Sequence, residues 1–240
     1  MNARPMIPLR ALMAALLCAA TTALAAPTGV GITYEVRMNG SAVGTLTEQY
    51  QAKSGSYSVS SVSAPSGVFA LVPRLWFRLT SEGALTADGL RPHRFEGRRT
   101  RGDVLEAAAD FDWTTRELAL AHEGRTEKLE LPAGTQDRLS VMYEFMHRLP
   151  RAAKANRLDV HVTNGRRIDH YSYTVKRDVD LETPLGRIKT VHLERVREGD
   201  ENSHEVWLAQ DRGYVPVRLV ITERDGPRFE QIVTRLDTTP

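Results

Sequence analysis

Residues 32–40 read ITYEVRMNG, and this stretch indicates the fold class of the chain. Apolar side chains occupy every second position from Ile32 to Met38, with Thr, Glu and Arg between them. This period of two is typical of a β-strand that buries one face. Asn39-Gly40 follows, and both residues tolerate the positive φ angles that a tight hairpin turn needs. The stretch therefore predicts a strand that turns into an antiparallel neighbour.

The same alternation recurs along most of the chain and is interrupted by short segments that favour turns. Matching the pattern gives roughly ten to twelve strands. So many strands must close, roll or split into two layers to limit their exposed edges. The sequence therefore predicts a mainly β protein, a large curled antiparallel sheet that forms a β-roll or an open barrel. The turn signals are Ser54-Gly55, Asp88-Gly89, Asn164-Gly165, Asp211-Arg212-Gly213 and Asp225-Gly226.

One segment shows helical periodicity instead. Between Gln136 and Leu149, apolar residues recur at spacings of three and four, which predicts one main helix over about residues 136–149. We expect Thr135 as the N-cap, Asp137 in the first turn and Pro150 as the residue that stops the helix. A helix of this length, about 20 Å, needs a sheet to cover its apolar face.

Residues 66–79 (SGVFALVPRLWFRL) are apolar without strict alternation. Pro73 interrupts them, and proline is poorly tolerated inside a regular strand. We expect a short helix here, followed by a strand from Trp76.

The N-terminal residues carry the features of an export signal. A basic start with Arg4 and Arg10 precedes a short apolar run over residues 11–20. Ala23-Leu24-Ala25 then supplies the small residues that signal peptidase recognises. The sequence predicts a signal peptide over residues 1–25, cleaved between Ala25 and Ala26. It places the mature chain, residues 26–240, in the periplasm as a single β-rich domain.

Cys18 is the only cysteine and lies in that apolar run. It is an apolar filler lost with the signal or, in a second interpretation, a lipidation site, although Leu16-Leu17 before it are not small. A mature chain without cysteine excludes disulfides, thiolate metal sites and a cysteine nucleophile. No later stretch is apolar over 18 residues, so we expect no transmembrane span.

Charge is balanced once residues 1–25 are removed. Two arginines are lost and no acid, which leaves 30 Lys and Arg against 30 Asp and Glu. A dedicated nucleic-acid binder would carry a surface of one sign. The composition therefore argues against nucleic acid as a partner.

Several phrases together resemble a known family. The most specific reads Gln136-Asp137-Arg138-Leu139-Ser140, a few residues after Leu131-Pro132. Looser phrases are Tyr34-Glu35-Val36, Ala109-Asp110-Phe111-Asp112-Trp113, Thr183-Pro184-Leu185-Gly186 and Val206-Trp207-Leu208-Ala209. They resemble the family called domain of unknown function 3108, exported envelope proteins of Gram-negative bacteria, over roughly residues 28–237. The resemblance implies a β-roll similar to that of a capsule-associated lipoprotein and, more distantly, to the open barrels of lipoprotein carriers. It implies no catalytic residue and no cofactor.

The residues themselves offer no catalytic motif. Seven histidines show no metal-ligand spacing, no serine stands in a nucleophile elbow, and no glycine-rich loop precedes a helix. We therefore predict no cofactor and no metal. Asp110 and Asp112 share one face of a strand and, with Asp137, are the candidates for paired carboxylates. The alternative is that Asp110 and Asp112 only form the wet face of a hairpin.

Two further sets of side chains are candidates for ligand binding. The aromatic residues that face inward have two interpretations. They line an apolar groove for an acyl chain or a sugar, or they simply fill the core. The basic stretch from Arg91 to Arg101 also has two interpretations. It binds lipid headgroups, lipopolysaccharide phosphates or acidic glycan, or it is a strand pair exposed to solvent. The candidate groove residues are Trp76, Trp113, Tyr143, Tyr171, Tyr173 and Trp207, and the candidate anion-binding residues are Arg98, Arg99 and Arg101.

These observations favour a non-enzymatic periplasmic envelope protein. It would bind a lipid, a glycan or an outer-membrane component, or assist its transport or assembly, with the helix as wall or lid of a groove. Its partner is then an envelope lipid, a polysaccharide or another envelope protein. The alternative is a periplasmic hydrolase that uses paired carboxylates over a cleft.

Overall fold

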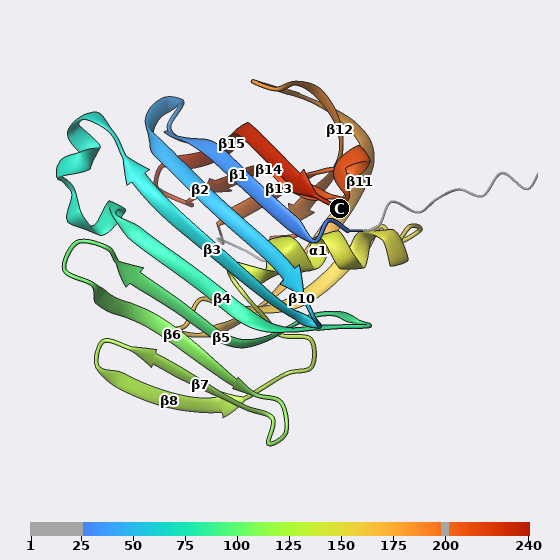
Figure 1. Cartoon of the computed structure of the whole chain (residues 1–240). Coiled ribbons are helices and arrows are strands. Elements are labelled where there is room, and N and C mark those ends of the chain that lie inside the picture. Colours follow the sequence, from blue (N-terminus) through green and yellow to red (C-terminus); the bar gives the residue numbers. More distant parts are fainter. Residues whose placement is uncertain (1–25, 198–201) are drawn as a thin grey trace, which may run out of the picture.

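Fifteen strands form one sheet in the computed structural model, which describes residues 26–197 and 202–240 (Figure 1). The predicted signal peptide, with Cys18 and Ala25, lies outside the described residues. Within the described ranges no helix is both long and apolar enough to cross a bilayer.

The first half of the chain supplies β1 (Gly29–Met38), β2 (Ser41–Lys53), β3 (Ser56–Pro65), β4 (Phe77–Thr86), β5 (Gly89–Arg99), β6 (Val104–Asp112), β7 (Glu117–His122) and β8 (Arg125–Glu130). The second half supplies β9 (Gln136–Asp137), β10 (Arg157–Thr163), β11 (Ile168–Thr183), β12 (Gly186–Arg195), β13 (Ser203–Ala209), β14 (Val215–Thr222) and β15 (Arg228–Thr239). The helix α1 (Ser140–Arg151) and three short 3-10 turns complete the fold: η1 (Gly67–Leu71), η2 (Pro73–Leu75) and η3 (Gln210–Arg212).

Neighbours in the sheet are mostly neighbours in the sequence. The order runs β8-β7-β6-β5-β4-β3-β2-β1-β15-β14-β13-β12-β11-β10-β9, so the first and last strands pair in the middle. All pairs are antiparallel except β9 with β10, which makes the sheet mixed. The predicted large curled sheet is confirmed, and it does not close into a barrel because β8 and β9 remain as edges. These two strands were also hard to predict, since β8 has no apolar alternation and β9 has only two residues.

Residues 32–40 fold as their alternating pattern predicts. Val30, Ile32 and Tyr34 of β1 are buried, while the residues between them are partly exposed. Asn39 and Gly40 both adopt positive φ, 50° and 83°, as a tight two-residue hairpin between β1 and β2 requires.

The helix α1 lies inside the curl of the sheet (Figure 1). Tyr143 and Met146 belong to a core with strands of the first half, including β2 and β5. Val141, Phe145 and Leu149 face the other way and pack against strands from β10 to β13. A fully buried side chain of this size stabilises the fold by roughly 1.5–3 kcal/mol, so the helix acts as a central core element.

The helix bounds differ from the predicted ones at both ends. α1 begins at Ser140 rather than near Gln136, because Gln136 and Asp137 pair with β10 as strand β9. Asp137 therefore precedes the helix, and Thr135 is not the N-cap; its hydroxyl donates to the Pro132 carbonyl at 2.7 Å. Pro150 stands inside the last turn and the helix ends one residue later.

The irregular segment after β3 is confirmed as short helical turns followed by a strand. η1 and η2 occupy it, and β4 begins at Phe77, next to the expected Trp76. Both turns lie at one end of the sheet, beyond β3 (Figure 1).

Candidate functional site

An arginine-lined hollow lies at the N-terminal end of α1. It consists of two adjoining cavities, of about 250 and about 70 Å³, that share Phe77, Leu79 and Arg138. Together they reach the lower end of the roughly 300–1,000 Å³ typical of small-molecule sites. We call them the arginine hollow; its arginines are Arg74, Arg98, Arg99, Arg138, Arg166 and Arg218.

The floor of the arginine hollow is apolar. Phe77 and Leu79 come from β4, where alternation directs both side chains to one face of the sheet. Phe95 of β5 adds to this floor, and Leu139 and Met142 add the start of the helix. A ligand with an anionic group and a hydrocarbon part would match this combination of charged rim and apolar floor.

Arg138 is positioned by the phrase Gln136-Asp137-Arg138-Leu139-Ser140. Gln136 donates from Nε2 to the Leu90 carbonyl of β5 at 2.8 Å, and the Ser81 hydroxyl donates to Asp137 Oδ2 at 2.6 Å. The backbone N–H of Arg138 donates to the Thr163 carbonyl at 2.9 Å. Hydrogen bonds to β4, β5 and β10 therefore fix the backbone from which the Arg138 side chain reaches both cavities.

The side chain of Arg138 makes no ion pair or side-chain hydrogen bond with any residue that the structure describes. The side chain of Arg138 is exposed to solvent, and protein atoms packed around it lower the pKa of its guanidinium, an effect that the charge of Asp137 partly offsets. An arginine nonetheless stays protonated at neutral pH. The positive charge also contributes, after burial and Arg195, to lowering the pKa of His204 to about 4. Arg138 is thus a solvent-accessible cation that forms no ion pair with a described residue.

The other arginines of the hollow are only partly neutralised. Arg98 pairs with Glu96 at 3.0 Å, and Arg99 and Arg166 both pair with Glu106. Arg74 forms no ion pair within the described ranges. Two carboxyls line the hollow, Glu106 and the buried Glu48, whose pKa is raised by burial. Arg218 also pairs with Glu230 at 2.5 Å, and Arg166 also pairs with Glu123 at 3.1 Å. Among the residues that the structure describes, Arg74 and Arg138 are the two arginines of the hollow without an ion pair.

Sequence reasoning predicted part of this site. Arg98 and Arg99 were candidates and line the hollow, while the third candidate, Arg101, lies with its guanidinium 4.6 Å from the centre of the Trp76 ring. Arg138 was missed as a ligand-binding residue because a helix expected to begin at residue 136 gives no indication that this side chain lines a cavity. The signal that could have found it is the specific phrase around it.

The six candidate groove aromatics do not line one common cavity. Tyr143 and Tyr173 are fully buried core residues, and Trp207 is nearly so, stacked on His192 at 4.2 Å. Trp76 and Tyr171 are half-buried, each under an arginine. Trp113 lines a separate cavity, so ligand binding by this set stays a prediction.

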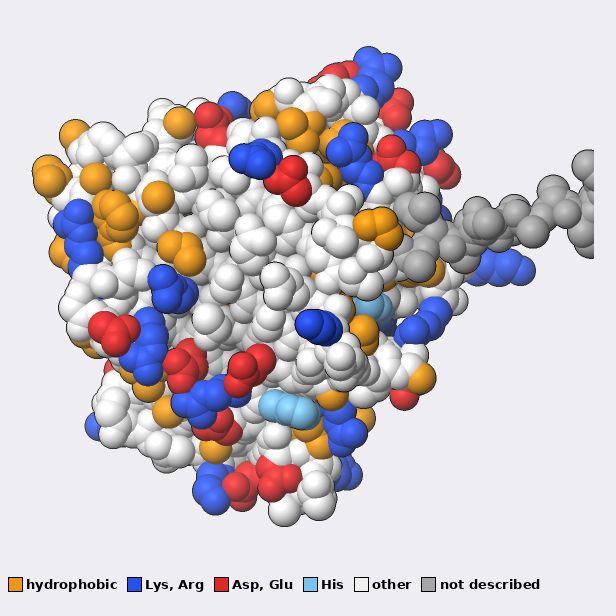
Figure 2. All heavy atoms as spheres, in the orientation of Figure 1, with side chains coloured by type: hydrophobic (Ala, Val, Ile, Leu, Met, Phe, Trp, Pro, Cys, Tyr) orange, Lys and Arg blue, Asp and Glu red, His pale blue; other side chains and the backbone are white. Residues whose placement is uncertain are grey.

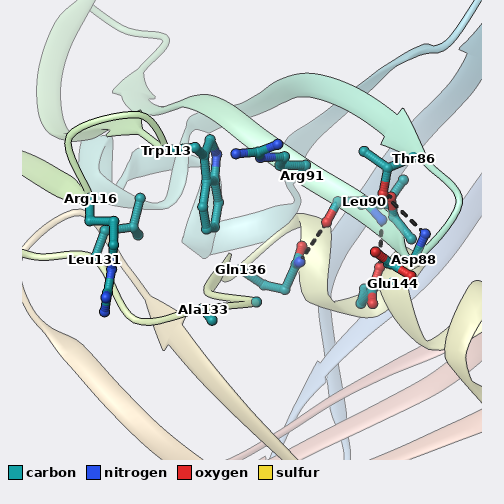
Figure 3. Close-up of a pocket in the computed structure, with 12 residues that line it drawn as sticks. Thr86, Asp88, Leu90, Arg91, Trp113, Arg116, Leu131, Ala133, Gln136 and Glu144 are labelled. Atoms are coloured by element: carbon teal, nitrogen blue, oxygen red, sulfur yellow. Dashed lines mark hydrogen bonds between the residues drawn. The ribbon is translucent and has the colours of Figure 1, made fainter.

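That separate cavity, about 430 Å³, opens between β5, the β6–β7 turn, the loop before β9 and α1 (Figure 3). Trp113 and Arg91 lie side by side at one end, with the guanidinium 5.1 Å from the ring centre (Figure 3). Glu144 lies at the other end, where its Oε2 accepts the Leu90 N–H at 2.7 Å. Burial raises the pKa of Glu144 to about 7.

The candidate carboxylates are dispersed. Asp110 is exposed and pairs with Arg94 at 2.5 Å, and Asp112 is exposed and accepts the N–H groups of Thr114 and Thr115. Asp137 is fully buried, with its oxygens engaged by Ser81 and by the start of α1. The three do not face one another across a cleft.

The histidines give no metal centre in the part of the chain that the structure describes, where no group of three or more His, Cys, Asp or Glu could hold an ion. His161 lies opposite His170 on the β10–β11 hairpin, with ring centres 4.9 Å apart.

The family described as "Protein of unknown function (DUF3108)" matches residues 33–233, a range that contains every residue lining the arginine hollow. The chain belongs to this family. Among curated proteins, none matches the sequence.

Two solved structures align with most of this DUF3108 chain. A β-barrel-like protein of domain of unknown function DUF1849 from Brucella abortus superposes with a TM-score of 0.55 at 12% identity, over 89% of this chain and 98% of that one. A putative outer membrane lipoprotein-sorting protein domain from Vibrio parahaemolyticus gives a TM-score of 0.31 at 7% identity, over 88% and 85% of the two chains. The first likeness supports the curled fold of this DUF3108 chain.

Proposed function

We propose that this protein is a non-enzymatic periplasmic protein that binds an anionic amphiphile of the cell envelope in the arginine hollow and assists its transport or assembly. The ligand class is a lipid or a lipid-linked glycan with a phosphate or carboxylate group. The observation that carries the proposal is Arg138, a cation that lines both cavities above an apolar floor and forms no ion pair with a described residue.

The chemistry follows from what a guanidinium offers. Its planar donors bind phosphate or carboxylate through two parallel hydrogen bonds, which are stronger than bonds between neutral groups. Phe77, Leu79 and Met142 beneath it can cover the first methylene groups of an acyl chain. The small volume means that the hollow holds the anionic group and the start of the chain, and the rest of the ligand lies outside it.

The periplasm is where this ligand class and the chain would meet. The export signal predicted over residues 1–25 supports that location. The hydrolase alternative has less support, because its three candidate carboxylates occupy an exposed hairpin and a buried helix start.

The test is calorimetric titration with a short-chain lipid below its critical micelle concentration. Dihexanoyl phosphatidylglycerol is the anionic probe, and dihexanoyl phosphatidylcholine, with no net charge, is its counterpart. We expect the wild type to prefer the anionic lipid. Arg138→Ala should weaken that binding about ten- to hundredfold, since a hydrogen bond to a charged group contributes roughly 1.5–3 kcal/mol.

The matched control is Arg187→Ala, which removes an exposed arginine that pairs with Glu182 beside the β11–β12 turn. It should bind like the wild type. Equal affinity of the wild type for both lipids, or an Arg138→Ala variant that binds as tightly as the wild type, would contradict the proposal.

A further inference from the structure

An apolar tip protrudes at the end of the sheet beside the arginine hollow. Val68 and Leu71 of η1 are 74% and 78% exposed, and Val104 and Leu105 at the start of β6 are 42% and 41% exposed. Figure 2 shows hydrophobic side chains gathered at the left edge of the molecule, the end where Figure 1 places η1. We define the apolar tip as η1, η2 and these two residues of β6.

Hydrogen bonds fix the backbone of the segment that carries the exposed residues Val68 and Leu71. Trp76 folds back on η1 and donates from Nε1 to the Ala70 carbonyl at 2.9 Å. The Ser63 hydroxyl donates to the Leu75 carbonyl at 2.6 Å, which fastens η2 to β3. The Thr100 N–H donates to the Trp76 carbonyl at 2.9 Å, which joins the tip to the β5–β6 hairpin. These contacts hold the backbone while the aliphatic side chains point to solvent.

Two arginines without ion pairs among the described residues flank the apolar side chains. Arg74 in η2 is exposed, and Arg101 in the β5–β6 turn lies over the ring of Trp76. Neither forms an ion pair with a described residue. Protruding aliphatic side chains beside arginine and tryptophan match a bilayer interface, where apolar groups enter the acyl boundary and cations meet phosphates.

We propose that the apolar tip docks on the surface of an anionic lipid bilayer. Val68 and Leu71 enter the acyl boundary, and Arg74 and Arg101 contact lipid phosphates. This docking does not depend on what the arginine hollow binds. Because Arg74 belongs to both, docking would also bring the mouth of the hollow to the membrane.

The test is cosedimentation of the folded chain with vesicles. One set contains phosphatidylglycerol and phosphatidylethanolamine, and the other only phosphatidylcholine, both in 0.1 M salt. We expect the wild type to sediment with the anionic vesicles and at least tenfold less with the neutral ones. The double variant Val68→Asp with Leu71→Asp should lose at least tenfold in partitioning, with an unchanged melting temperature because both side chains are exposed.

Two further variants separate the causes. Leu185→Asp changes an aliphatic residue that is 38% exposed in the β11–β12 turn, and it should sediment like the wild type. Arg74→Gln with Arg101→Gln should bind more weakly and with less dependence on salt. Arg138→Ala should keep vesicle binding, so failure of the hollow and failure of the tip are told apart.

The proposal is wrong if the wild type stays in the supernatant with anionic vesicles, which would leave a protein partner as the occupant of the tip. It is also wrong if neutral vesicles bind equally well, or if the aspartate double variant sediments like the wild type.

Discussion

Two ionisable residues at the ends of cavities lack an ion-pair partner among the described residues. Arg138 forms no ion pair, while Glu144 lies between α1 and β5 with one backbone N–H as its hydrogen-bond partner. Burial of an ionisable group disfavours the charged form unless contacts compensate. Ligand affinity should therefore depend on the charge of Arg138, and the free energy of unfolding should depend on the charge of Glu144.

Glu144 should make stability fall as pH rises. Its pKa is raised to about 7 in the folded chain from 4.5, mainly by burial, so the native state holds the proton more tightly than the unfolded chain. This contribution is fully present below pH 4.5 and is lost as pH rises through 7, by about 3 kcal/mol in total. Glu144→Gln should remove that loss, and urea unfolding between pH 5 and 8 measures it. Parallel stability profiles for wild type and variant would show that Glu144 titrates normally.

The Glu144 carboxylate leaves no room for a side chain at position 89, which is a glycine. Its φ is +131°, and a Cβ there would lie 2.4 Å from Glu144 Oε2. Gly89→Ala should therefore cost several kcal/mol, from backbone strain together with displacement of Glu144. Gly186→Ala is the control, because its φ is +95° but a Cβ meets nothing within 4 Å, so it should cost only about 1 kcal/mol. If thermal melts showed similar losses of stability for Gly89→Ala and Gly186→Ala, a steric clash with Glu144 would be contradicted.

At the scale of elements, the start of α1 depends on a buried aspartate. Asp137 Oδ1 accepts the N–H groups of Leu139 and Ser140 at 2.9 and 2.8 Å, and the Ser81 hydroxyl of β4 donates to Oδ2. It satisfies helix donors that are otherwise unpaired and also ties the helix to the sheet.

Asp137→Ala should cost roughly 2–4 kcal/mol, because a cap is lost and buried donors stay unsatisfied. Asp112→Ala is a matched control, since Asp112 also accepts two backbone N–H groups but is exposed. Water replaces those bonds, so the control should lose at most about 1 kcal/mol. Equal losses in denaturant titrations would mean that burial of Asp137 contributes nothing.

Elements with a repeating pattern could be predicted from the sequence, and those defined by single contacts could not. Alternation identified β1, and the spacing of Met142, Met146 and Leu149 identified the helix. The start of α1 was misplaced because helical periodicity continues back to residue 136, while pairing with β10 holds Gln136 and Asp137 extended. Such a pairing joins residues far apart in sequence, and a periodicity count does not register it.

At the scale of the whole molecule, the sheet curls around α1 and leaves the arginine hollow at one end of the helix. Because the curl brings together residues that are far apart in the sequence, only some of the residues in the arginine hollow could be predicted. Arg98 and Arg99 form part of a visible basic stretch, whereas Arg138 and Arg166 reach the same space only when β9 and the β10–β11 turn come to β5. The curl also explains why Tyr143 and Tyr173 fill the core, since the helix occupies the interior that a hollow barrel would leave open.

The central claim is that Arg138 holds an anionic amphiphile, and native mass spectrometry of the protein purified from cell envelopes tests it most directly. We predict that the wild type carries an adduct that fragments to an anionic lipid or lipid-linked glycan, and that Arg138→Ala, purified in parallel with Arg187→Ala, loses it while the control keeps it. A wild type free of any adduct, or the same adduct at the same occupancy in Arg138→Ala, would contradict the claim.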